Sequence, residues 1–132
     1  PLAYSVDLDG DGQLEWILEN PRARAVLSSQ DGGRWLEFVW KDSGLNVLPE
    51  NGALAGTGAA SVQLTSDGGL EFRGNGWRRL VRLASGVASL TVEQSTPLPP
   101  EALRTGKKND IVLHVTRESP EKALYSIDRP AE

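Results

Sequence analysis

The carboxylates best suited to chemistry lie close together near the start of the chain, in the segment Asp7-Leu8-Asp9-Gly10-Asp11-Gly12. Calcium takes about six to eight oxygen ligands, and a tight loop supplies them from alternate side chains and then from a backbone carbonyl. Glycine at the intervening positions lets the backbone curl around the ion. The spacing therefore predicts a calcium site. Its ligands would be Asp7, Asp9, Asp11, the carbonyl of Gln13, and Glu15 either directly or through water.

An acidic turn that binds nothing is the alternative to this calcium site. Position twelve, where a helical EF-hand carries an acid, is Leu18, and the preceding residues are typical of a strand. The segment instead resembles the calcium loops of FG-GAP and related bacterial β-repeat proteins, which continue into a strand. This chain departs from them in having Glu15 in place of Asp and in carrying one copy of the motif, so we do not expect a β-propeller.

The four tryptophans are the second group with possible binding chemistry. An indole is a flat apolar surface with one polar group, which suits the C–H face of a sugar ring when hydroxyl partners lie nearby. Trp35 alternates with Leu36 and falls on the opposite face of its strand, and Trp77 follows a glycine turn. These two are the predicted sugar platform, and we expect Trp16 and Trp40 in the core. The alternative is that all four serve packing alone.

No set of residues indicates catalysis. His114 is the sole histidine and cysteine is absent, so neither a histidine-based triad nor a thiol nucleophile is available. Acids in the expected strands do not form a recognisable pair for glycoside hydrolysis. We therefore assign no catalytic residues and expect no activity in this domain.

The elements that must position these residues are short β-type runs separated by turns rich in Gly, Asn and Asp. They predict an all-β fold, a mostly antiparallel β-sandwich of about eight or nine strands. The expected strands are Glu15–Asn20, Arg22–Ser29, Arg34–Lys41, Ser61–Ser66, Leu70–Arg73, Trp77–Ser85, Val87–Ser95, Asp110–Glu118 and Ala123–Asp128.

Length and charge narrow the class of protein. The 132 residues fit a single domain, 1–132, and the net charge of −4 without a basic run argues against a nucleic-acid partner. No apolar run is long enough to cross a membrane. The chain starts at Pro1 and contains no methionine, so we expect a processed product or a piece of a longer protein.

A longer stretch carries a second resemblance. Leu18-Glu19-Asn20, the turn Gly32-Gly33-Arg34 and the later turn Ser43-Gly44 resemble the opening of galactose-mutarotase-like β-sandwich domains, which occur in α-mannosidases and amylase-type glycoside hydrolases. The resemblance covers about the first third of the chain and implies a sugar-related context. The mutarotase reaction uses paired histidines with a carboxylate base, and a chain with His114 alone is not expected to perform it.

Together these features predict a non-catalytic, calcium-binding accessory or carbohydrate-binding module of a larger carbohydrate-processing protein. Its expected partners are a carbohydrate and the neighbouring domains. Calcium at the millimolar level outside cells suits a loop of this type, so the predicted location is secreted or periplasmic. The alternative is a structural or adhesion-type interaction domain with a calcium-stabilised loop.

Overall fold

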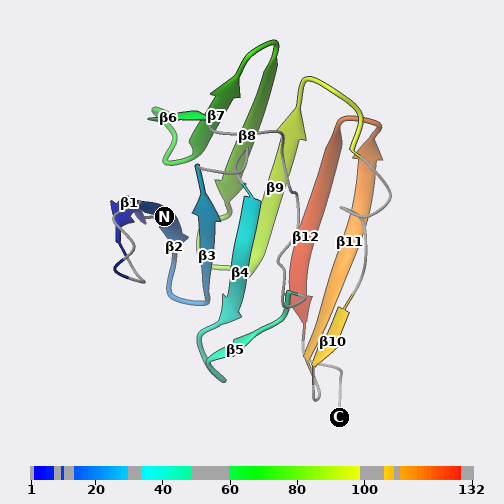
Figure 1. Cartoon of the computed structure of the whole chain (residues 1–132). Helices are drawn as coiled ribbons and strands as arrows, with labels where there is room; N and C mark the ends of the chain where they lie inside the picture. Colours follow the sequence, from blue (N-terminus) through cyan, green and yellow to red (C-terminus); the bar gives the residue numbers. More distant parts are fainter. Residues whose placement is uncertain are drawn as a thin grey trace.

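The computed structural model describes residues 2–7, 10, 14–29, 34–48, 60–98, 106–108 and 111–128. All the regular structure in these ranges is β, in two antiparallel sheets (Figure 1). The five-stranded sheet has the order β1-β2-β3-β4-β5, which is β1 (Leu2–Val6), β2 (Glu15–Glu19), β3 (Ala23–Ser28), β4 (Arg34–Trp40) and β5 (Leu45–Asn46). The described part of the chain contains no helix capable of crossing a membrane.

The second sheet has seven strands in the order β10-β11-β12-β9-β8-β7-β6. These are β6 (Ser61–Leu64), β7 (Leu70–Gly74), β8 (Trp77–Leu83), β9 (Ser89–Gln94), β10 (Gly106–Lys108), β11 (Ile111–Ser119) and β12 (Lys122–Asp128). The predicted all-β antiparallel class is confirmed. The expected number of eight or nine strands is wrong, because β1, β5 and β10 are short strands at or next to sheet edges that were not foreseen.

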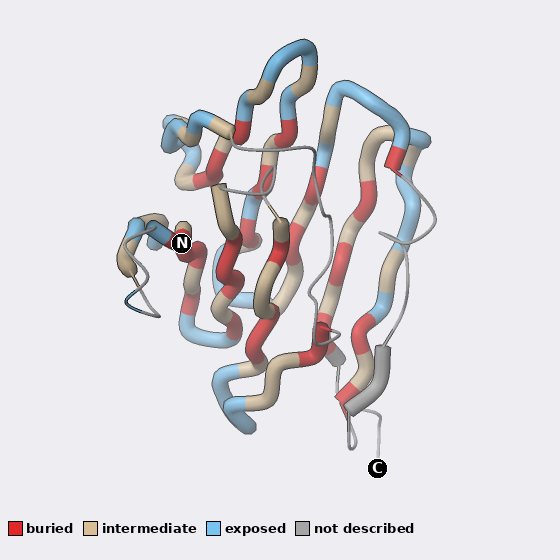
Figure 2. Tube along the Cα trace, viewed as in Figure 1, coloured by how far each residue is buried: buried red, intermediate tan, exposed pale blue. Residues whose placement is uncertain are grey.

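One hydrophobic core joins the two sheets, as in a β-sandwich. Buried residues recur at alternate positions along β7, β8, β9 and the first half of β11 (Figure 2), so that the seven-stranded sheet turns one face inward. In β2 and β3 consecutive residues are buried. Leu18, Ala25 and Leu27 come from the five-stranded sheet, and Phe72 and Val92 come from the seven-stranded sheet. On β11 the side chains alternate, with Leu113 buried and His114 exposed.

Strand β4 departs from the predicted alternation. Val26 pairs with Glu37, but the next residue, Leu27, pairs with Trp35, so Leu36 is an extra residue in a β-bulge. A bulge shifts the phase of the side chains by one position. Trp35 and Phe38 therefore both point into the core with no exposed surface, and the prediction that the strand face carrying Trp35 is open to a sugar is wrong.

Candidate functional site

The predicted calcium loop joins β1 to β2. Val6 and Glu15 are cross-strand partners, so Asp7 and Glu15 stand at the two ends of the loop, close together at its base. The backbone N–H of Gly10 donates to Oδ1 of Asp7 at 3.0 Å. Glu15 is 6% exposed and belongs to the outer face of the five-stranded sheet.

Three of the five predicted ligands, Asp9, Asp11 and Gln13, lie outside the described residues. Among the residues that are described, no group of three or more potential ligands forms a metal cluster. The chemistry of the donor set at the base of the loop fits a hard cation, since Asp7 and Glu15 both offer carboxylate oxygens. The calcium site stays a prediction.

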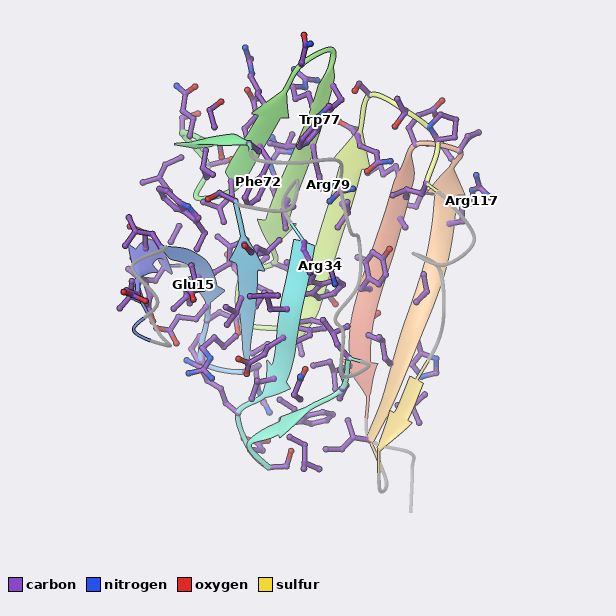
Figure 3. All side chains as sticks on the ribbon, in the orientation of Figure 1. Glu15, Arg34, Phe72, Trp77, Arg79 and Arg117 are labelled. Carbon is purple, nitrogen blue, oxygen red and sulfur yellow. The ribbon has the colours of Figure 1, made fainter. Side chains whose placement is uncertain are left out.

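Trp77 lies at the turn between β7 and β8. It pairs with Gly74, and its indole packs so closely on that glycine that an added Cβ would lie 2.1 Å from Nε1. The turn between them, Asn75-Gly76, has φ +81° at Gly76, a conformation that glycine adopts without strain. The side chain is half-buried against the core, at the hairpin end of β8 (Figure 3).

Polar groups surround Trp77 in an open hollow of about 440 Å³. Arg73 and Arg78 are cross-strand partners beside it, and Ser95 comes from the end of β9. The backbone N–H of Arg78 donates to the hydroxyl of Ser95 at 2.9 Å, and the backbone of Ser95 donates back to the carbonyl of Arg78. The hollow is thus lined by an indole, by two arginines, of which Arg73 is also paired with Glu71, and by a serine hydroxyl.

Trp35 is not part of any platform. It is fully buried, with its ring centroid 4.8 Å from that of Phe38 and 4.9 Å from that of Tyr125. Its Nε1 has no hydrogen-bond acceptor among the described residues. A sugar cannot reach this indole, so the prediction of a sugar contact at Trp35 is corrected.

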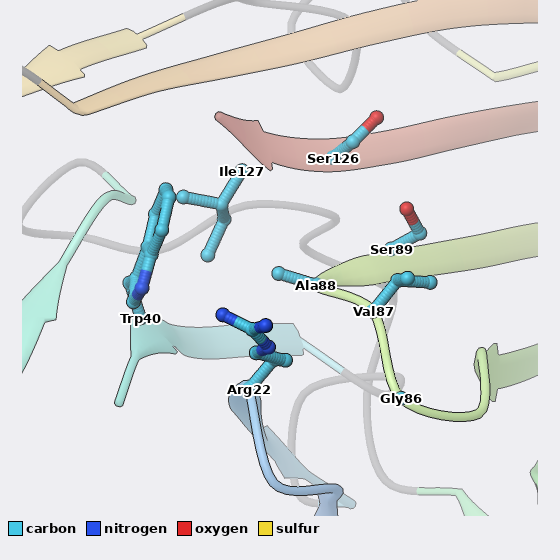
Figure 4. Close-up of a pocket in the computed structure, with 8 residues that line it drawn as sticks. All are labelled: Arg22, Trp40, Gly86, Val87, Ala88, Ser89, Ser126 and Ile127. Carbon is cyan, nitrogen blue, oxygen red and sulfur yellow. The ribbon is translucent and has the colours of Figure 1, made fainter. Parts of the chain in front are cut away.

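A second hollow, which the sequence did not indicate, lies at the other end of the sandwich. It has a volume of about 360 Å³ and is lined by Arg22, Trp40, Gly86, Val87, Ala88, Ser89, Ser126 and Ile127 (Figure 4). Trp40 was expected in the core, but it is half-buried and forms one wall. The opposite wall comes from residues more than forty positions further along the chain, which no local pattern connects to Trp40.

Charged groups on the outer face of the five-stranded sheet form a connected cluster around Glu19. Its carboxylate binds Nζ of Lys41 and accepts from the hydroxyl of Tyr4, both at 2.8 Å. The hydrogen bond from Lys41 and then that from Tyr4 lower the pKa of Glu19, and the bond to Glu19 raises the pKa of Tyr4. This cluster fastens the edge strand β1 to its neighbours.

Comparisons with known proteins give one structural neighbour. No family model matches the chain, and no curated protein matches it. A solved structure of a 4-alpha-glucanotransferase from Thermococcus litoralis is similar, with a TM-score of 0.53 and 10% sequence identity over 98% of this chain. The chain spans 37% of that protein. At this identity the likeness shows a shared all-β fold and a distant relation in fold to a carbohydrate-processing enzyme.

Proposed function

We propose that the chain is an accessory domain of a larger carbohydrate-processing protein, of the galactose-mutarotase-like β-sandwich type, and that it binds sugar at Trp77. The observation that carries this proposal is the half-buried indole in an open hollow, with arginine donors and a serine hydroxyl beside it. The role is binding, and the domain contributes no catalytic residue.

The hollow suits a sugar ring on physical grounds. Gly74 covers part of the indole and holds it in place, so the ring loses little freedom when a ligand stacks on it. Arginine offers donors without acceptors, and a serine hydroxyl both donates and accepts. Sugar hydroxyls need both kinds of partner. Arg78 is exposed and forms no ion pair among the described residues, so its guanidinium is available to a ligand.

The structural neighbour supports a choice of ligand class. It is named a 4-alpha-glucanotransferase, and this chain spans about a third of its length. An α-glucan is therefore the first sugar that we assign to the site.

Calcium is the second part of the proposal. Asp7 and Glu15 would hold the ion at the base of the β1–β2 loop, with Asp9, Asp11 and the carbonyl of Gln13 completing the shell. A bound cation relieves the repulsion among closely spaced carboxylates and stabilises the loop. A site of this kind fills at the calcium levels found outside cells, which supports the secreted or periplasmic location.

Titration calorimetry with maltohexaose tests the sugar site. The unmodified chain is expected to bind saturably and Trp77→Phe to bind more weakly. Trp77→Ala is expected to lose the binding that Trp77 provides, seen as a lower affinity or a lower stoichiometry, while keeping its melting transition. The matched control is Leu64→Ala, which removes an exposed apolar side chain from β6 of the same sheet. Equal affinity and equal stoichiometry in the unmodified chain and in folded Trp77→Ala contradict the assignment of the site.

An interaction domain is the second candidate, and one observation favours it. Leu2 and Val87 are exposed by 58% and 52%, and Leu2, Pro21 and Gly86 contribute apolar surface to a neighbouring open groove. Such a surface is typical of a contact with another domain. A chain that binds no glycan but associates through this groove would support this candidate.

A further inference from the structure

We infer that the domain has a second sugar-binding site at the end opposite Trp77, in the hollow between Trp40 and Arg22. This inference rests on the proposed carbohydrate function and extends it from one site to two. Figure 4 shows Arg22 reaching in between Trp40 and Ala88, with the hydroxyls of Ser89 and Ser126 on the far rim. The volume of about 360 Å³ lies within the range of small-ligand sites.

The walls of this hollow are joined by a buried asparagine. Asn20 is 6% exposed, and its Oδ1 accepts from the backbone N–H groups of Arg22 and Ala23 at 2.8 and 2.9 Å. Its Nδ2 donates to the carbonyls of Ala84 and Val87 at 2.6 and 2.8 Å. The turn before β3 is thereby tied to the turn between β8 and β9.

Two further backbone hydrogen bonds hold the walls of this hollow. The backbone N–H of Lys41 donates to the carbonyl of Arg22 at 2.9 Å, which sets Arg22 beside Trp40 across strands β3 and β4. The backbone N–H of Ile127 donates to the carbonyl of Ala88 at 2.9 Å, which joins the start of β9 to the end of β12. A ligand therefore meets preformed walls and does not have to order them, which favours affinity.

The lining groups match those around Trp77. Each hollow presents a half-buried indole with at least one arginine and at least one serine hydroxyl. Arg22 has Asp42 as its ion-pair partner, at 3.6 Å, and both side chains are more than half exposed. An exposed pair of this kind contributes little free energy, so the guanidinium exchanges it for sugar oxygens at small cost.

The two hollows lie at opposite ends of β9. Ser89 starts β9 and lines the Trp40 hollow, while Ser95 follows the end of β9 and lines the Trp77 hollow. Six residues of extended strand separate these serines by about 20 Å. A domain with two such sites holds two sugar chains, or two stretches of one polysaccharide, and gains avidity on a polymer.

Indole N–H signals in a proton–nitrogen correlation spectrum test this inference, with maltohexaose as the probe. The chain has four tryptophans, and substitution of each by Phe assigns its signal. Titration is expected to move the Trp40 and Trp77 signals with separate saturation curves. The signal of Trp35, which is fully buried and distant from solvent, is the internal control and should stay in place.

Two variants separate the second site from the first. In Trp77→Ala the Trp40 signal is expected to keep moving with the same affinity. In Arg22→Gln its affinity is expected to fall about tenfold, the loss typical of a hydrogen bond to a charged group. Arg82→Gln is the matched control, because Arg82 is also half-exposed and paired with an aspartate, Asp67.

The possible outcomes distinguish the two proposed sites. The second site is supported if the Trp40 signal still moves in Trp77→Ala and reports weaker binding in Arg22→Gln. This holds even if the Trp77 signal stays still and the first site fails. A Trp40 signal that stays still while Trp77 saturates overturns the second site and leaves the proposed function intact. No movement of either signal contradicts both sites.

Discussion

The indole of Trp35 meets the ring of Tyr125 edge-on, with centroids 4.9 Å apart and planes at 83°. Trp35 belongs to the five-stranded sheet and Tyr125 to the seven-stranded sheet, so this pair joins the two layers. Both side chains are buried, and the ring of Phe38 also packs on the indole, with centroids 4.8 Å apart. The contact makes Trp35 a core residue and excludes it from ligand binding.

Trp35→Ala is therefore expected to destabilise the fold by about 3–5 kcal/mol, because it leaves a large cavity between the sheets. Urea unfolding monitored by circular dichroism measures the change. Leu64→Ala removes an exposed side chain and should change the free energy of unfolding by less than about 0.5 kcal/mol. If Trp35→Ala lowers the free energy of unfolding no more than Leu64→Ala does, the placement of Trp35 in the core is contradicted.

Tyr125 makes stability depend on alkaline pH. Burial raises its pKa from 10.0 to about 12. A phenol with a higher pKa in the folded state keeps its proton more tightly there, so its contribution to stability is complete below pH 10 and is lost as the pH rises to about 12. The expected loss is on the order of 3 kcal/mol across that window.

Chemical unfolding at a series of pH values from neutral to strongly alkaline measures this dependence. Tyr125→Phe keeps the ring and removes the phenol, so most of the alkaline slope should disappear. Tyr4→Phe is the comparison variant. The pKa of Tyr4 is also raised, by its hydrogen bond to Glu19, but Tyr4 lies outside the core, so its loss should reduce the slope by less than Tyr125→Phe does. If stability falls with alkaline pH as steeply in Tyr125→Phe as in the unmodified chain, Tyr125 is not the source of that fall.

Gly74 should control the position of the Trp77 indole. Because a Cβ at residue 74 would lie within 2.6 Å of three indole atoms, Gly74→Ala must push the side chain off its position. We expect altered tryptophan fluorescence and weaker maltohexaose binding in a protein that still folds. Gly44→Ala is the control for a glycine with open space around it, where the cost is backbone strain alone. Full retention of both fluorescence and binding in Gly74→Ala would argue against the packing of Trp77 on this glycine.

Calcium binding is tested by the melting temperature after chelation and after addition of calcium. At ten times its dissociation constant, a bound ion adds about 1.4 kcal/mol, a rise of a few degrees for a domain of this size. The double variant Asp9→Ala with Asp11→Ala is expected to lose the rise. Asp42→Asn removes an acid from a different exposed turn and should retain it. If millimolar calcium does not raise the melting temperature of the unmodified chain, the proposed calcium site is contradicted.

Alternation and turn chemistry were sufficient to predict the fold class. The turn at Asn75-Gly76 and the exposure of His114 beside buried Leu113 both follow from local sequence. The bulge at Leu36 does not, because its extra residue has no signature in composition. That single residue reversed the predicted orientation of Trp35.

Candidate sites built from residues far apart in the sequence were harder to predict from the sequence. Trp77 lies in a hairpin that local rules predict, so its place beside Gly74 could be foreseen. The hollow at Trp40 requires residues from β9 and β12, which only the three-dimensional order of strands brings together. Asn20 belongs to the segment that resembles mutarotase-like domains, and its four hydrogen bonds give a physical reason for an asparagine there.

The most direct test of the central proposal, that the domain binds carbohydrate through Trp77, is a glycan-array screen of the unmodified chain beside Trp77→Ala. We expect selective capture by α-glucan oligosaccharides and clearly weaker capture of the variant. Absence of binding to every glycan class by a folded, calcium-loaded chain would contradict it and favour an interaction domain.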